Sequence, residues 1–320
     1  MTTAFDHLFA FALEHPWAIT ADMLGRIAGI LADRVAGVKA DASELAALAT
    51  QRQALPQAKR GGGVALIPVQ GVLAPRMNLM SEMSGGATFQ QLAQAVAAAL
   101  ADPEVKTLVF DVDSPGGNVA GASEFHKILL KARAQKPCIA SVNYLCASAA
   151  YWTMSAATKI IAAPSAQIGG IGVLAIYDDL TAALEQRGIK RKVLSAGRFK
   201  GEALGGPLSA EADAHLQGLI DQTYGRMTTD IALGRSVKVA TVRGGYGEGF
   251  CILADTALAA GMIDEIATLE ETLARLGVTA ASASLSAATD QEPLAATSQE
   301  RAVNALWHNA ILGEVLALDL

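Results

Sequence analysis

The sequence predicts an α/β domain with a largely parallel sheet. Short apolar runs alternate with helical segments over most of the chain. The runs at 107–112 and 138–142 are rich in apolar residues and bounded by polar or turn-forming ones, as buried parallel strands are. Hydrophobic residues make up 52% of the 320 residues and charged residues 18%, which favours a large buried core over a disordered chain.

The predicted organisation has four parts. Residues 1–60 carry helical periodicity and an Ala-rich stretch, and the pattern is broken by three glycines at 61–63. We therefore expect residues 1–60 to form a helical N-terminal extension. The α/β domain spans 61–277. Small polar residues make 278–299 a linker, and 300–320 is an amphipathic C-terminal helix.

Within the domain the elements alternate in order. Strand-like runs are expected at 64–73, 107–112, 138–142, 159–162, 167–173 and 191–194. Helices are expected at 88–100, 119–133, 178–187 and 209–234, with a further buried helix beginning in the stretch 143–153. Thr88 and Ser209 stand where helix N-caps belong.

Charge and cysteine content exclude several classes of protein. A net charge of −6 gives no electrostatic footprint for nucleic acid or an anionic membrane. Cys138, Cys146 and Cys251 lack metal-ligand spacing, so no metal is expected, and no cofactor is expected either. The use of cysteine fits a reducing compartment. The N-terminus resembles no signal peptide and no apolar run reaches transmembrane length. We expect a soluble cytoplasmic protein without a membrane anchor.

A double glycine follows the strand at 107–112. Gly116 and Gly117 let the backbone approach a ligand closely and turn N–H groups toward it, which is what an oxyanion hole requires. The carboxyl end of a strand is also where ligand sites of α/β sheets lie. An ordinary tight turn is about as compatible with this pattern, whereas the glycine spacings of phosphate-binding loops are absent here.

Ser148 lies in a small-residue turn between a strand and a helix. Cys146, Ala147, Ala149 and Ala150 surround it, and such a turn can present a nucleophilic hydroxyl. The helix N-terminus supplies unpaired N–H groups beside a developing oxyanion. Taken alone, the stretch is more typical of a buried Ala/Ser-rich helix, with Ser148 as a small core residue.

A nucleophilic serine needs a general base. None of the five histidines lies between His126 and His215, the region after Ser148, and those two are more typical of packed or structural residues. Lys200, on a polar loop 52 residues after Ser148, is the alternative. A lysine acts as a base only when neutral, which requires burial or nearby positive charge, and Phe199, Leu204 and Arg198 could supply these. Taken alone, Lys200 is more typical of a solvated loop lysine.

Four motifs in this order resemble the signal peptide peptidase A family, and in particular its phage and prophage head maturation proteases. They are Ser-Pro-Gly-Gly at 114–117, Ala-Ser-Ala-Ala-Tyr at 147–151, Ile-Gly-Gly-Ile-Gly-Val at 168–173 and Gly-Arg-Phe-Lys at 197–200. The resemblance covers about residues 64–275. The stretch His-Pro-Trp-Ala-Ile-Thr at 15–20 also resembles the leader of the phage branch.

The resemblance implies a Clp/crotonase-like fold and a serine endopeptidase with a Ser–Lys dyad. Ser148 would be the nucleophile and Lys200 the general base, and backbone N–H groups of Gly117 (or Gly116) and Ala149 would form the oxyanion hole. Tyr151 would pack behind the nucleophile. The implied partners are a polypeptide substrate, such as a scaffold or portal protein, and further copies of the chain. The implied location is the bacterial host cytoplasm or the procapsid.

The sequence departs from the family pattern at Gly170, where family members commonly carry a serine whose hydroxyl could orient the lysine. Alternatives therefore stay open. One is a catalytically impaired capsid-assembly or scaffold-binding protein, and another is a general cytoplasmic protease similar to signal peptide peptidase. A crotonase-type acyl-CoA enzyme is a third, although the sequence lacks an obvious acidic catalytic pair for it.

Overall fold

A sheet of eight strands forms the centre of the computed structural model, which describes residues 16–35, 59–75, 86–202 and 206–278. Six strands follow the order β10-β7-β6-β4-β3-β2, and β8 pairs with β6 and β9. All pairs are parallel except β2 with β3 and β8 with β9. The strands are β2 (Lys59–Gly61), β3 (Val64–Gln70), β4 (Thr107–Ser114), β6 (Cys138–Ala147), β7 (Lys159–Ala162), β8 (Gln167–Gly169), β9 (Cys251–Leu253) and β10 (Glu265–Ile266).

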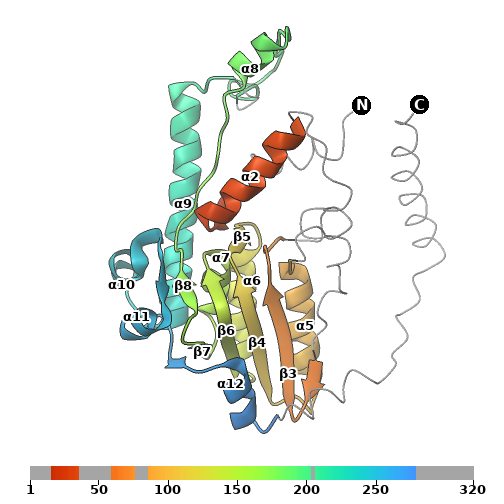
Figure 1. Ribbon diagram of the computed structural model, residues 1–320, viewed down its shortest axis with the longest axis vertical. Coiled ribbons are helices and arrows are strands. Elements are labelled where there is room, and N and C mark those ends of the chain that lie inside the picture. The colour runs from red at the N-terminus through yellow and green to blue at the C-terminus, as the bar shows by residue number, and fades with distance from the viewer. Residues whose placement is uncertain (1–15, 36–58, 76–85, 203–205, 279–320) are drawn as a thin grey trace, which may run out of the picture. The chain divides into compact units, whose positions relative to one another are not determined.

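Helices cover both faces of this sheet (Figure 1). On one face lie α5 (Phe89–Ala101), α6 (Ala122–Arg133) and α7 (Ala149–Met154), whose buried residues form the main core with the strands. On the other, α12 (Leu269–Arg275) packs over Val64 and Val109. The expected α/β class, with a largely parallel sheet and flanking helices, is confirmed. Among the described residues, the remaining helices are α2 (Ala21–Val35), α8 (Thr181–Gln186), α9 (Ala210–Arg235), α10 (Val239–Gly245), α11 (Ala254–Ala259) and the 3₁₀ turn η1 (Gly247–Gly249).

Local sequence explains where the long helices begin. Thr88 caps α5 with a complete capping box, because its side chain accepts from the Gln91 amide while the Gln91 side chain accepts from the Thr88 amide. Ser209 caps α9 by accepting from the Ala212 amide at 3.2 Å. Both caps stand at the positions that the sequence predicts.

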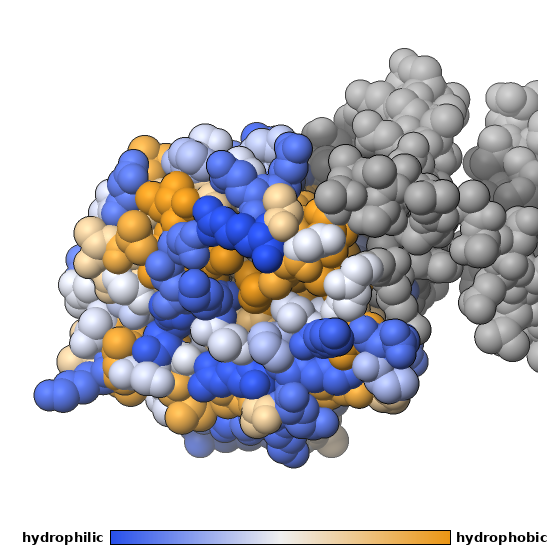
Figure 2. Space-filling model, turned by 90° about the horizontal axis from the view of Figure 1, so that it is seen from below, coloured by the Kyte–Doolittle hydropathy of each residue, from blue (hydrophilic) through white to orange (hydrophobic). Residues whose placement is uncertain are grey.

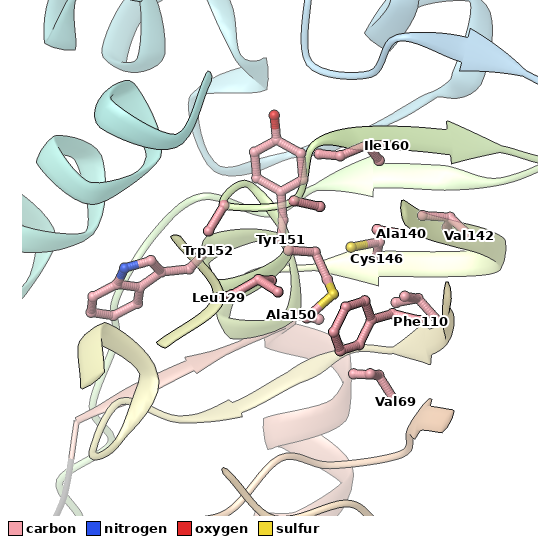
Figure 3. Close-up of a cluster of buried hydrophobic side chains, with 14 of the residues drawn as sticks. Val69, Phe110, Leu129, Ala140, Val142, Cys146, Ala150, Tyr151, Trp152 and Ile160 are labelled. Carbon is pink, nitrogen blue, oxygen red and sulfur yellow. The ribbon is translucent and has the colours of Figure 1, made fainter. Parts of the chain in front are cut away.

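The core is densest where β4, β6 and α7 meet. Phe110, Val142, Cys146, Ala150 and Tyr151 are completely or almost completely buried there, and Figure 3 shows their side chains gathered between strand and helix. Small side chains on β6 and α7 allow the helix to approach the sheet closely, so the turn between them is held on both sides.

The structure differs from the predicted elements in several places, and the run expected as a strand at 167–173 is one only over Gln167–Gly169. Trp17–Ile19 forms a strand, β1, inside the stretch expected to be helical, and it pairs with β5 (Gly116–Asn118). The strand β6 continues to Ala147, so the helix begins later than expected. Residues 191–194 are not a strand, because they have no neighbouring strand to complete their hydrogen bonds.

The proposed domain boundaries remain predictions. The chain divides by contacts into Met1–Thr279 and Ala280–Leu320. The linker from 279 onward, the C-terminal helix at 300–320 and much of the N-terminal extension lie outside the described residues.

The face of the molecule seen from below carries hydrophilic and hydrophobic residues interspersed (Figure 2). Exposed ion pairs such as Lys159 with Glu265, 3.3 Å apart, contribute little to stability because water screens them. Within the described ranges, every helix is too short or too polar to cross a bilayer.

Candidate active site

Ser148 occupies a strained turn between β6 and α7. Its φ of 55° and ψ of −116° lie outside the regions that side-chain-bearing residues favour, and such strain persists only where surrounding contacts enforce it. Its amide donates to the carbonyl oxygen of Gly169 at 2.7 Å, and its carbonyl oxygen accepts from the Trp152 amide at 2.8 Å. The turn resembles the sharp strand-to-helix elbow that presents nucleophiles in α/β enzymes.

The hydroxyl of Ser148 is directed toward the segment after β8. Ser148 Oγ lies 3.4 Å from the carbonyl oxygen of Gly172, to which it donates a long hydrogen bond. The residue has no exposed surface in this state. A peptide substrate therefore reaches this hydroxyl only if part of the surrounding structure moves away.

Tyr151 has a structural role one turn further along α7. Its hydroxyl donates to the carbonyl oxygen of Met262 at 2.9 Å, and its ring packs edge-on against Tyr246. Burial raises the pKa of the Tyr151 phenol well above its ordinary value, so it stays protonated. Figure 3 shows its hydroxyl pointing away from the cluster beneath it. These contacts fix α7 and with it the turn at Ser148.

The two glycines of β5 lie beside this turn. Gly116 has a φ of 99°, and a Cβ there would lie 2.2 Å from the carbonyl oxygen of Ala18 and 3.0 Å from the Ala149 amide nitrogen. A Cβ on Gly117 would lie 1.9 Å from the carbonyl oxygen of Leu73. Only glycine fits at either position. The structure thus brings Gly116, Ser148 and Ala149 together.

The backbone groups around the glycines already have partners. The Gly116 amide donates to Ser114 Oγ at 3.2 Å, and its carbonyl oxygen accepts from the Leu73 amide at 2.8 Å. Gly117 is paired with Ala18 of β1. An incoming oxyanion would have to replace some of these interactions before these amides could stabilise it.

Gly170 lies directly behind the turn. Its φ is 59°, and a Cβ there would lie 3.3 Å from Cys251 Sγ and 3.4 Å from the Ser148 amide nitrogen. Burial raises the pKa of the Cys251 thiol, which keeps it protonated. A small polarisable group thus lies where the side chain of a residue at 170 would point. The sequence contains no signal that would have indicated Cys251.

Lys200 lies apart from this cluster within one chain. It is exposed, on a projecting segment that we call the arm, comprising residues 177–202 and 206–208. Arg198 of the arm forms a 3.0 Å ion pair with Glu211 in the first turn of α9. The side chain of Trp152 on α7 donates to Asp230, which lies nineteen residues further along α9. At ~1.5 Å per residue the backbones of Glu211 and Asp230 are roughly 28 Å apart along the axis of α9.

The apolar cover considered for Lys200 is incomplete. Phe199 is 46% exposed and stacks with the Arg198 guanidinium, and Leu204 lies outside the described residues. His126 and His215, the histidines nearest to Ser148 in sequence, offer no substitute base. His126 is completely buried in α6, and His215 is exposed on α9. Ser148 Oγ bonds to a backbone carbonyl instead. Among the described residues, no three His, Cys, Asp or Glu side chains cluster as metal ligands would.

Comparison with known proteins gives the context for this site. A family model described as Peptidase family S49 matches residues 131–282. Head-tail preconnector protein GP5 of Enterobacteria phage P21 is 29% identical over 64% of this chain and 40% of the relative. Capsid assembly protease C of Escherichia phage lambda is 30% identical over 64% of this chain and 46% of the relative. The chain therefore spans less than half of the length of either phage protein.

Two further similarities extend beyond phages. "Putative protease slr0021" of Synechocystis sp. is 30% identical over 58% of this chain and 68% of the relative. Among solved structures, a ClpP1 mutant from Listeria monocytogenes aligns with a TM-score of 0.42 at 13% identity, covering 65% of this chain and 94% of that one.

Proposed function

The chain belongs to peptidase family S49, and from that premise we propose that it is a serine endopeptidase with Ser148 as its nucleophile. The observation that carries the proposal is the strained turn at Ser148 beside the double glycine of β5. Strained backbone of this kind is concentrated at functional sites, and a purely structural serine would not require it.

The proposed reaction is acyl transfer to Ser148 followed by hydrolysis. Ser148 Oγ attacks the scissile carbonyl carbon as its proton passes to a neutral lysine, Lys200. Backbone N–H groups of Gly116 or Gly117 and of Ala149 stabilise the tetrahedral oxyanion. The lysine then protonates the leaving amine, and it afterwards takes a proton from the water that releases the acyl group.

We propose that the lysine of each site comes from another copy of the chain. Lys200 is exposed on the arm, and within one chain Arg198 of the arm pairs with Glu211, at the opposite end of α9 from Asp230, which bonds to α7. The arm also exposes apolar side chains, with Leu194 83% and Ile189 49% exposed, beside a hollow of about 740 Å³. Such a surface favours contact with a second copy, which would bury Lys200 beside Ser148 and favour its neutral form.

The proposed substrate is a polypeptide of phage capsid assembly, such as a scaffold or portal protein. The names of the two phage relatives motivate this choice. A catalytically impaired assembly protein is the second candidate, since the distance between Lys200 and Ser148 within one chain favours it.

A mixing experiment tests the dyad and its arrangement. Ser148→Ala and Lys200→Ala should each lower casein hydrolysis at least ~1000-fold, as loss of one member of a catalytic unit does. Dissociating and reassembling the two variants together should restore roughly a quarter of wild-type activity, because one random site in four then joins an intact serine to an intact lysine across the interface. The exposed arm variant Lys192→Ala is the matched control and should retain activity.

The outcomes separate the alternatives. Loss of activity in both variants without recovery on mixing would place the lysine in the same chain as its serine. Full activity of Ser148→Ala would refute the proposed function. If Ser148 reacts with no fluorophosphonate probe in any assembly state, and no variant chain that retains Ser148 and Lys200 hydrolyses casein, the result would support the impaired assembly protein.

A further inference from the structure

A strand from the N-terminal segment lies along the double glycine beside Ser148. Trp17–Ile19 runs antiparallel to Gly116–Asn118, with Ala18 opposite Gly117 and Ile19 opposite Gly116. On its other side, Trp17 exchanges both backbone hydrogen bonds with Leu174, at 2.8 and 2.9 Å. The segment therefore lies as a strand between the double glycine and the chain that follows Gly172.

This placement is the one that an extended peptide would need at the proposed site. Peptides commonly bind by adding a strand to exposed backbone groups. Thr20 donates to the carbonyl oxygen of Pro115 at 3.0 Å. Because hydrogen-bonded pairs alternate along an antiparallel ladder, Ala18 and Gly117 are the next pair in position to exchange backbone bonds. The strand β1 thus engages the backbone assigned above to the oxyanion hole.

The carbonyl of Ala18 also lies near the second proposed oxyanion donor. A Cβ placed on Gly116 would lie 2.2 Å from the carbonyl oxygen of Ala18 and 3.0 Å from the backbone nitrogen of Ala149. The sum of these two distances, 5.2 Å, is the largest possible separation of the two atoms. The carbonyl of Ala18 therefore lies close to the place that a substrate carbonyl would take.

Side-chain packing holds the strand in place. Trp17 and Ile19 are 1% and 3% exposed and form an apolar cluster with Leu24 and Val72. Ala18 has no exposed surface and packs into the main core. Burial of a large aromatic and a β-branched side chain gives this short strand an affinity that its few backbone bonds alone would not provide.

We propose that β1 is an intramolecular occupant of the peptide cleft, which keeps the chain latent until an extended polypeptide or an assembly contact displaces it. The proposal rests on the proposed function of the Ser148 site. It accounts for a nucleophile with no exposed surface in this state. Substrate affinity is then reduced by the fraction of chains whose cleft is vacant, and weakening β1 removes that reduction.

The first test measures cleft occupancy without catalysis. In the full chain carrying Ser148→Ala, a fluorescein-labelled peptide with the sequence of residues 15–22, HPWAITAD, is titrated and its anisotropy is followed. Ala18→Glu, which places a charge in a fully buried position, should tighten binding at least tenfold. Ala21→Glu is the matched control because Ala21 is exposed at the start of α2, and it should leave binding unchanged.

The second test does not depend on a buried charge. Trp17→Cys combined with Leu174→Cys replaces a hydrogen-bonded antiparallel pair, whose Cα atoms are ~5.5 Å apart and within disulfide range. The oxidised chain should bind the peptide at least tenfold more weakly than the reduced chain, and reductant should reverse the difference. Equal binding by the oxidised and reduced chains, or by Ala18→Glu and its parent, would overturn the proposal.

Activity assays then distinguish this proposal from the proposed function. With Ser148 restored, the reduced double-cysteine chain should hydrolyse casein faster than the wild type, and the oxidised chain should be silent. If peptide binding responds as expected but no chain with Ser148 hydrolyses any peptide, the occupancy stands and the peptidase assignment fails. If the wild type hydrolyses casein as fast as Ala18→Glu, the chain is not latent.

Discussion

The backbone amide of Ser148 donates a 2.7 Å hydrogen bond to the carbonyl oxygen of Gly169, which joins the strained turn to β8. Gly169 itself has a φ of 126°, and a Cβ there would lie 2.8 Å from the carbonyl oxygen of Phe250. The geometry of the turn therefore depends on a position that only glycine occupies without strain.

Gly169→Ala should destabilise the fold by about 1–3 kcal/mol, because the new side chain requires both an unfavourable φ and a shift of backbone atoms. Urea denaturation measures this change, and reaction of Ser148 with a fluorophosphonate probe measures the effect on the turn. Gly218→Ala, in the middle of α9 with no atom within 4 Å of the new Cβ, is the control. It should stabilise the helix by roughly 0.5–1 kcal/mol. Equal effects of the two substitutions would contradict the prediction.

Arg235 and Asp264 join the C-terminal end of α9 to the sheet. The guanidinium donates to both carboxylate oxygens at 2.9 and 2.7 Å, and Asp264 also accepts from the Ile160 amide. Burial raises the pKa of Asp264, but these donors outweigh it and hold the pKa below its usual range. Lysine cannot reproduce the planar two-point contact.

We therefore expect Arg235→Lys to cost roughly 1–3 kcal/mol of unfolding free energy. Arg198→Lys makes the same change in an ion pair whose side chains are 72% and 62% exposed, and it should cost under ~0.5 kcal/mol. Chemical denaturation of both variants gives the comparison. A cost for Arg235→Lys no larger than that for Arg198→Lys would show that the two-point contact adds nothing.

His126 is completely buried, and the charges of Asp230, Arg133 and Lys127 lie near its ring. Burial lowers its pKa to about 4, against the opposing influence of Asp230. Well above pH 6.5 the ring is neutral in both the folded and unfolded chains. As the pH falls from 6.5 to 4, the unfolded chain binds a proton that the folded chain does not, so stability falls.

The stability lost over this range should approach about 3 kcal/mol. In His126→Leu the decrease in melting temperature between pH 7 and pH 5 should therefore be smaller than in the wild type. His215→Leu, at an exposed position of α9, should leave the pH dependence as it is. An unchanged pH profile in His126→Leu would show that His126 does not titrate between these limits.

The sheet could be predicted from the sequence because its strands are short apolar runs with clear boundaries. The bounds of β7 agree with the predicted run at 159–162, and α5 and α9 begin after the predicted caps at Thr88 and Ser209. Burial on both faces makes such runs continuously apolar, and side-chain caps leave a local signature.

The relations across the site could not be predicted in the same way. The pairing of β1 joins segments about a hundred residues apart, and three residues at the edge of a helical pattern carry no signal for it. The separation of 52 positions between Ser148 and Lys200 likewise does not determine their distance, because the arm carries Lys200 toward the distal end of α9. The position of Lys200 depends on tertiary contacts rather than on local sequence.

Leu194 is 83% exposed on the arm, although its side chain is among the most apolar. Under the proposed assembly, this residue lies where a second copy covers the arm. Leu194→Glu should therefore lower the oligomeric mass measured by light scattering, since a buried unpaired carboxylate disfavours the interface. Casein hydrolysis should fall in parallel, because the Lys200 of another copy no longer reaches Ser148.

Leu233→Glu makes the same change at a residue 60% exposed on α9, outside the arm, and should preserve both mass and activity. A wild-type chain that stays monomeric while active, or an unchanged mass in Leu194→Glu, would remove the arm from the proposed assembly and return the search for the base to a single chain.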